Sequence, residues 1–222
     1  MTSTWDEIYG RGAHLNRYPW DVVVSFVFSN APAGKSREQT SVLEVGFGAG
    51  SNLWFAAREG FQVAGVEGSR DAVDYARRRF DEEGLSGDLR VGDFSTLPFP
   101  DASFDLAIDR GSLTCVGLSE ASRAVAEIRR TLRTGGKFLF NPYSSAHSSA
   151  RNGSPGDDGL TEDITDGALV GVGPICFYDR PHLEQVLGEG WAIRNLQQLE
   201  VVDEARNDSI HAEWRVITEK LS

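Results

Sequence analysis

The chain has 222 residues, 40% of them hydrophobic and 25% charged, which suits one α/β domain with a sizeable core. Its formal net charge of −11 repels phosphate backbones, so no nucleic-acid partner is expected. The apolar runs, such as Val22 to Phe28, are too short to span a bilayer, so no membrane insertion is expected.

Residues 1–35 read as one or two helices with an aromatic-rich connection. The first residues lack the features of a signal peptide, and the two cysteines have neither disulfide nor metal-site spacing. A cytoplasmic location without a bound metal is therefore expected.

From about residue 40, strand-like and helix-like segments alternate, which predicts a parallel sheet covered by helices. The expected strands are 41–45, 61–66, 89–91, 104–108 and 137–140. The expected helices are 52–59, 72–83 behind an N-cap at Ser69, one with Ala121, Val125, Ile128 and Leu132 on one face, and 180–187. Gly135 and Gly136 are expected to end the third of these helices.

Two strands, 191–202 and 210–218, follow at the end of the chain, the first broken or bent somewhere. The short polar loop 203–209 between them predicts a hairpin, which places an antiparallel strand in an otherwise parallel sheet. The exposed edge of this hairpin could pair two chains as a homodimer.

Residues 141–176 are rich in Ser, Gly, Asp and Pro and show no clear period. A structureless segment of this length is uncommon unless it is a lid, a binding segment or disordered. We therefore expect a single domain, 1–222, with an N-terminal helical cap at 1–35 and a lid or substrate segment at 141–176.

Gly46, Gly48 and Gly50 follow an apolar strand, where they allow a sharp turn and a close approach to a ligand. Glu67 comes 21 residues after Gly46, at the end of the next strand, where a carboxylate can accept hydrogen bonds from ribose hydroxyls. Asp93, after the third strand, could accept from an adenine amino group, with Phe94 packed on the base.

Residues 42–52, 92–94, 97–99, 104–109 and 132–138 resemble the motifs of class I S-adenosylmethionine-dependent methyltransferases. The resemblance implies a three-layer, Rossmann-like α/β fold whose seven-stranded sheet is mostly parallel, with an antiparallel last strand and the order 3-2-1-4-5-7-6. It also implies S-adenosylmethionine as cofactor and S-adenosylhomocysteine as product.

The resemblance further implies a set of cofactor-binding residues. These are Glu44 at the start of the first motif, Gly46, Gly48, Gly50, Asn52, Glu67, Gly68, Asp93, Phe94 and Asp109, which would face the methionyl amino group or the substrate. The N-terminal segment is similar to that of a bacterial subgroup of these enzymes, and Tyr9 or Tyr18 could lie near the sulfonium.

Methyl transfer to a hydroxyl group needs a general base, whereas an amine that loses its proton before the reaction depends less on one. His14, His147 and Asp109 are the candidates for catalysis, and Tyr143, His147 and Arg151 are the candidates for substrate contacts. His182 on a helix and His211 on a strand read as surface or structural residues.

The predicted acceptor is a small molecule, and a hydroxyl group of a sugar or metabolite is the first candidate for the methylated group. Two alternatives stay open at this point. A non-catalytic cofactor-binding protein would share all the cofactor residues. A nicotinamide-dependent oxidoreductase would share the glycine turn, but its third glycine position falls on Ser51 here.

Overall fold

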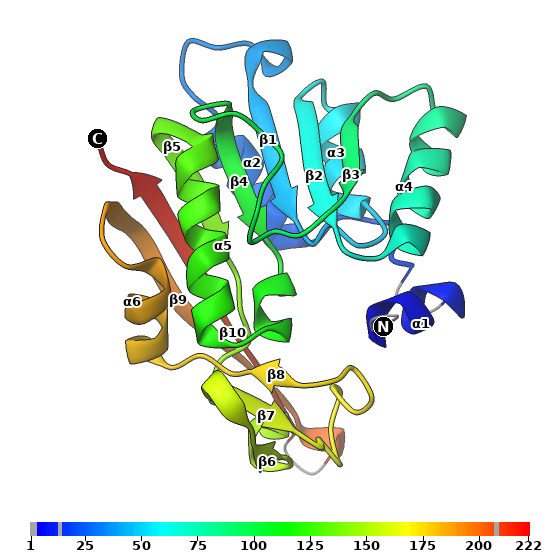
Figure 1. The fold of residues 1–222 in the computed structure, drawn as a ribbon, viewed down its shortest axis with the longest axis vertical. Coiled ribbons are helices and arrows are strands. Elements are labelled where there is room, and N and C mark those ends of the chain that lie inside the picture. The colour runs from blue at the N-terminus through cyan, green and yellow to red at the C-terminus, as the bar shows by residue number, and fades with distance from the viewer. Residues whose placement is uncertain (1–3, 13–14, 207–208) are drawn as a thin grey trace.

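The computed structural model describes residues 4–12, 15–206 and 209–222. A seven-stranded sheet in the order β3-β2-β1-β4-β5-β10-β9 forms the centre of the molecule, with helices on both of its faces (Figure 1). The strands β1 to β5 are parallel, and β10 lies antiparallel between β5 and β9. The predicted order 3-2-1-4-5-7-6 is confirmed, because β9 and β10 are the sixth and seventh strands of this sheet.

The strands of this sheet are β1 (Ser41–Val45), β2 (Gln62–Glu67), β3 (Asp88–Val91), β4 (Phe104–Asp109), β5 (Leu132–Phe140), β9 (Trp191–Asp203) and β10 (Ser209–Lys220). The helices are α1 (Thr4–Gly10), α2 (Asp21–Asn30), α3 (Ser51–Arg58), α4 (Arg70–Glu82), α5 (Leu118–Thr131) and α6 (Arg180–Leu187). No helix in these described ranges is long and apolar enough to cross a membrane.

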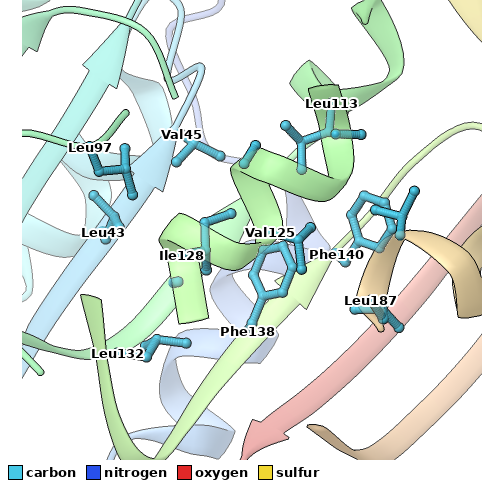
Figure 2. Packing of buried hydrophobic residues seen from close by; sticks show 14 of the residues in the cluster. Leu43, Val45, Leu97, Leu113, Val125, Ile128, Leu132, Phe138, Phe140 and Leu187 are labelled. Atoms are coloured by element: carbon cyan, nitrogen blue, oxygen red, sulfur yellow. The ribbon is translucent and has the colours of Figure 1, made fainter. Parts of the chain in front are cut away.

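The core lies in two layers, one on each side of the sheet. Strands β1 and β4 are buried on both faces, as is typical of central strands in a parallel sheet. Helices α2, α3 and α4 pack on one face, and α5 and α6 pack on the other. Figure 2 shows how apolar side chains of α5 meet those of β1 and β5, among them Leu43, Val45, Val125, Ile128, Phe138 and Phe140.

The end of α5 differs from the prediction. The helix stops at Thr131, and Leu132 adopts extended dihedral angles and pairs with Phe104 as the first residue of β5. Gly135 and Gly136 therefore lie inside β5, where the register with β4 shifts, and do not end the helix. Leu132 is buried in the expected core, so its spacing from Ile128 matched a helical face although it belongs to the strand.

The C-terminal hairpin is longer than expected. β9 extends over Trp191–Asp203, and its register with β10 shifts at Arg194, which is the extra residue opposite the step from Ile217 to Thr218. The irregularity expected in the first strand is therefore a local bulge in β9. Because β10 runs antiparallel to β5, its first residues lie beyond the carboxyl end of β5, where Glu213 pairs with Tyr143.

The segment 141–176 is not structureless. It forms a small antiparallel sheet from β6 (Ser154–Pro155), β7 (Leu160–Glu162) and β8 (Ile175–Cys176), drawn at the bottom of Figure 1. These strands are only two or three residues long, so their alternation is too short to show in the sequence. A separate apolar cluster supports them, formed by Ile164, Leu169, Val172, Ile175 and Phe177.

Candidate cofactor and acceptor site

A cavity of about 530 Å³ opens at the carboxyl ends of the parallel strands, where ligands bind in sheets of this kind. Its floor comes from the turn after β1, the end of β2 and the residues after β4. Its other walls come from the N-terminal segment (Trp5, Tyr9, Asn16 and Trp20), from residues 168–175 and from His211.

The turn after β1 brings bare backbone to the cavity. Gly46 and Gly48 have φ angles of +61° and +53°, which side-chain-bearing residues rarely adopt. A Cβ on Gly46 would lie 2.1 Å from the Cβ of Ser112, and one on Gly48 would lie 2.4 Å from Tyr9 Oη. Gly50 does not line the cavity, because it faces Ala76 of α4 and lets the two helices approach each other.

Glu67 lies in the cavity wall with Gly68, at the end of β2. Its Oε2 accepts a hydrogen bond from the backbone N–H of Gly48 at 2.9 Å, and its Oε1 accepts one from that of Ser69 at 2.8 Å. Burial raises the pKa of this carboxyl against the opposing effect of these donors. Each oxygen keeps a second lone pair, so the carboxylate can still accept from a pair of ribose hydroxyls.

Glu44 of β1 also lines the cavity and is almost fully buried. Its Oε1 accepts from Asn52 Nδ2 at 2.7 Å, whereas its Oε2 has no partner among the described residues. Burial raises the pKa of Glu44 to about 8, and the charges of Asp109 and Glu67 add to the effect of burial. A buried, unsatisfied carboxylate oxygen is what a bound ammonium group would satisfy, so this wall fits the methionyl part of the implied cofactor.

Asp109 lies behind the cavity wall. It is fully buried, and its Oδ1 accepts from the Ser112 hydroxyl and, at 3.0 Å, from the Leu113 N–H. These bonds shape the turn after β4, and burial raises the pKa of the carboxyl. The structure thus places Asp109 among the residues that support the site, outside those that line it.

Four further predicted contacts to the cofactor divide into two pairs. Phe94 and Tyr9 line the cavity. Asp93 is exposed outside it and accepts from the Ser95 N–H at 2.7 Å, as a turn residue does. Tyr18 also lies outside the cavity, 70% exposed, where its ring lies edge-on to Trp54.

The predicted substrate and base residues separate in a similar way. Tyr143 lines the cavity, but Arg151 is exposed outside it. His147 is 2% exposed and caps a short 3-10 helix, its Nδ1 accepting from the Ser149 N–H at 3.1 Å. Burial lowers the pKa of His147 to about 4, so at neutral pH it is an uncharged structural residue behind the wall. His14 lies outside the described residues.

Among the described histidines, the one that lines the cavity is His211, which the sequence predicted to be a surface or structural residue. Its Nε2 lies 3.5 Å from Oε2 of Glu213, and the same oxygen lies 3.1 Å from Nη2 of Arg110. Burial alone would raise the pKa of Glu213, but the His211 bond and the charges of Arg110 and Arg215 outweigh it and lower the pKa to about 2.

A signal for this group was present in the sequence. His211, Glu213 and Arg215 alternate along β10, and an antiparallel strand after β5 begins at the ligand-binding edge of the sheet. Alternation alone indicated a half-exposed strand, but Glu213 is 2% exposed.

The remaining wall is mostly apolar. It comes from the turn after β4 and from the small sheet, through Cys115, Val116, Leu169, Val172 and Ile175. Burial raises the pKa of the Cys115 thiol to about 11, so this side chain stays uncharged at neutral pH. A ligand in this part of the cavity would meet apolar surface on one side and His211 on another.

Comparison with known proteins relates the chain to methyltransferases. Residues 42–136 match the methyltransferase-domain family. A 37.1 kDa protein in a transposon of Streptomyces fradiae is 33% identical over 135 residues, which cover 59% of this chain and 34% of that protein. A fatty-acid O-methyltransferase of Mycolicibacterium smegmatis is 33% identical over 129 residues, covering 57% of this chain and 43% of the enzyme. The chain thus matches less than half the length of both relatives.

Among solved structures, a SAM-dependent methyltransferase from Methanosarcina mazei superposes with a TM-score of 0.71 at 20% identity, over 92% of this chain and 99% of that one. At that identity the likeness shows the fold. Residues 42–136 therefore match the methyltransferase-domain family, and the chain has the fold of the class I S-adenosylmethionine-dependent methyltransferases, whose cofactor is S-adenosylmethionine.

Proposed function

We propose that this protein transfers a methyl group from S-adenosylmethionine to a hydroxyl group of a small molecule, with His211 as the general base. The observation that carries the proposal is that one cavity combines the cofactor-binding walls, an apolar wall and the His211–Glu213 pair. The helical cap at 1–35 and the lid at 141–176 remain predictions. They are supported by the residues of both segments that line the cavity.

The proposed cofactor site uses Glu67 for the ribose hydroxyls, Glu44 for the methionyl amino group and the backbone of Gly46 to Gly48 for close contact. When bound, the cofactor supplies an electrophilic methyl group on a cationic sulfur. Methyl transfer is an in-line displacement, so the main task of the protein is to align the acceptor and exclude water.

His211 takes the role first considered for His14, His147 and Asp109. We assign the proton of the neutral imidazole to Nε2, which lies 3.5 Å from Oε2 of Glu213, so that Nδ1 is the nitrogen that accepts a proton from the acceptor hydroxyl. Glu213, with its pKa of about 2, remains a carboxylate at neutral pH and stabilises the imidazolium that forms. The hydroxyl oxygen bonds to the methyl carbon as its proton passes to His211.

The apolar wall favours an acceptor that carries an apolar portion beside its hydroxyl group, because buried hydrocarbon surface gains about 25 cal/mol per Å². The fatty-acid O-methyltransferase among the relatives has, by its name, an acceptor with a hydrocarbon chain, and this supports an apolar portion in the acceptor proposed here. The nicotinamide-dependent alternative is disfavoured by the matched family.

The test is the release of S-adenosylhomocysteine with a panel of small hydroxylated acceptors and their amine counterparts. We expect turnover on hydroxyl acceptors, and His211→Gln should lower kcat about 10²- to 10⁴-fold while S-adenosylhomocysteine binding stays unchanged. His182→Gln is the control, because His182 lies on α6 outside the cavity. Full turnover by the His211 variant, or turnover confined to amines, would refute this role.

A further inference from the structure

A buried cation, Arg110, faces the cavity from the residue directly after β4. Its side chain is 9% exposed, and its Cζ lies 4.2 Å from the centroid of the Trp20 ring, on which the guanidinium packs. Its Nη2 pairs with Glu213 at 3.1 Å. Its Nε is buried and makes no hydrogen bond within the part of the chain that the structure describes.

The charge of Arg110 is only partly balanced by its partner. Glu213 is shared, because Oε2 faces Arg110 and Oε1 accepts from Nε of Arg215 at 2.9 Å. Arg215 has a second, weaker partner in the exposed Asp21, at 3.7 Å. The buried carboxylate of Glu213 thus pairs with two guanidinium groups, and it also pairs with the imidazole of His211 when that ring is protonated. Glu213 alone therefore does not balance both guanidinium charges, and Arg110 is the one of the two that lines the cavity.

Two carboxyl groups line the cavity, and neither forms an ion pair with Arg110 among the described residues. Glu44 accepts from Asn52, with the charge of Arg110 among the effects that lower its pKa, and Glu67 accepts from backbone N–H groups. Arg110 is the guanidinium among the residues that line the described cavity. A guanidinium fixed by an aromatic ring and one ion pair is preorganised for a planar anion with two acceptor oxygens.

We propose that Arg110 is a carboxylate-binding residue of this cavity, on the basis that the cavity holds the cofactor and acceptor of the proposed function. Two ligands could supply the carboxylate: the methionyl part of the cofactor, or an acidic acceptor. In both cases the carboxylate would accept hydrogen bonds from the guanidinium group of Arg110.

The first experiment measures the binding of S-adenosylhomocysteine and of its decarboxylated analogue by calorimetry. If the carboxylate is that of the cofactor, Arg110→Gln should weaken S-adenosylhomocysteine about 10- to 100-fold and the analogue less than about 2-fold. Arg110→Lys, which keeps the charge but not the planar fork, should fall between wild type and Arg110→Gln. The lysine variant also keeps the test informative if the glutamine variant folds poorly.

The second experiment titrates octanoate and octanamide into the protein loaded with S-adenosylhomocysteine. If the carboxylate is that of the acceptor, the wild type should prefer octanoate about 10-fold or more, and Arg110→Gln should lose this preference. The matched control in both experiments is Arg215→Gln, which removes the other arginine at Glu213 without changing a cavity residue.

A purely structural Arg110 would change stability but neither ratio. The proposal is therefore overturned if Arg110→Gln leaves both the S-adenosylhomocysteine-to-analogue ratio and the octanoate-to-octanamide ratio at their wild-type values. A wild-type chain that does not bind S-adenosylhomocysteine at all would overturn the proposed function as well, so the two failures are distinguishable.

Discussion

Replacing Glu44 by Gln should remove a large pH dependence from the stability of the ligand-free protein. The pKa of Glu44 is raised from 4.5 to about 8, so between these values the folded chain holds a proton that the unfolded chain has released. The stability that this group contributes is present at low pH and is lost as the pH rises towards 8. Each pH unit changes it by about 1.4 kcal/mol, so the step from pH 5 to pH 8 amounts to up to about 4 kcal/mol.

Glutamine keeps the oxygen that accepts from Asn52 and cannot ionise. Urea unfolding of the wild type and of Glu44→Gln at pH 5, 6, 7 and 8 gives the difference in the free energy of unfolding at each pH. We expect this difference to move in favour of the variant by several kcal/mol as the pH rises. The exposed Glu184, replaced in the same way, serves as the control. A difference that is constant from pH 5 to pH 8 would refute the reasoning.

Three further changes test other parts of the structure. Gly48→Ala should cost about 1–2 kcal/mol of stability, because the backbone at this position has a positive φ. It should also weaken S-adenosylhomocysteine binding, because the added Cβ would collide with Tyr9 Oη in the cavity wall. Unchanged affinity in calorimetry would argue against the close approach at this turn. His147, with its pKa lowered from 6.5 to about 4, favours the folded state above pH 6.5, and this contribution of up to about 3 kcal/mol is lost as the pH falls to 4. The free energy of unfolding of His147→Gln, measured by chemical unfolding, should therefore depend less on pH than that of the wild type. Parallel pH profiles would count against burial as the cause. Ile128→Ala should lower the free energy of unfolding by about 2–5 kcal/mol, against about 0.5 or less for the exposed Arg123→Ala, and equal losses at the two sites would contradict the packing of α5.

The strand order could be predicted because its signals are local and repeated. Each central strand is an apolar run bounded by a turn, and the two polar-bounded strands after residue 190 indicated the antiparallel hairpin. The boundary at Leu132 could not be predicted, because a leucine four residues after Ile128 suits a helix face and a buried strand equally well.

The cofactor wall was also largely predictable, since Gly46, Gly48 and Glu67 lie at fixed positions relative to strand ends. The opposite wall was not, because it is assembled from segments far apart in sequence. His211 reaches the cavity only because β10 runs beside β5, and His147 and Tyr143 adopt their places only once residues 141–176 fold into a small sheet. The alternation along β10 did not by itself show that His211 reaches the cavity, and the short strands within 141–176 leave no periodic trace in the sequence.

The polar and apolar walls of the acceptor region are encoded in separable parts of the chain. His211 belongs to a strand held by hydrogen bonds on both sides, whereas Leu169, Val172 and Ile175 belong to a segment with its own small cluster. Residues 164–175 can therefore be varied to fit differently shaped acceptors without moving the proposed base. A library built on this segment alone would change which molecules are accepted while it preserves how their proton is removed.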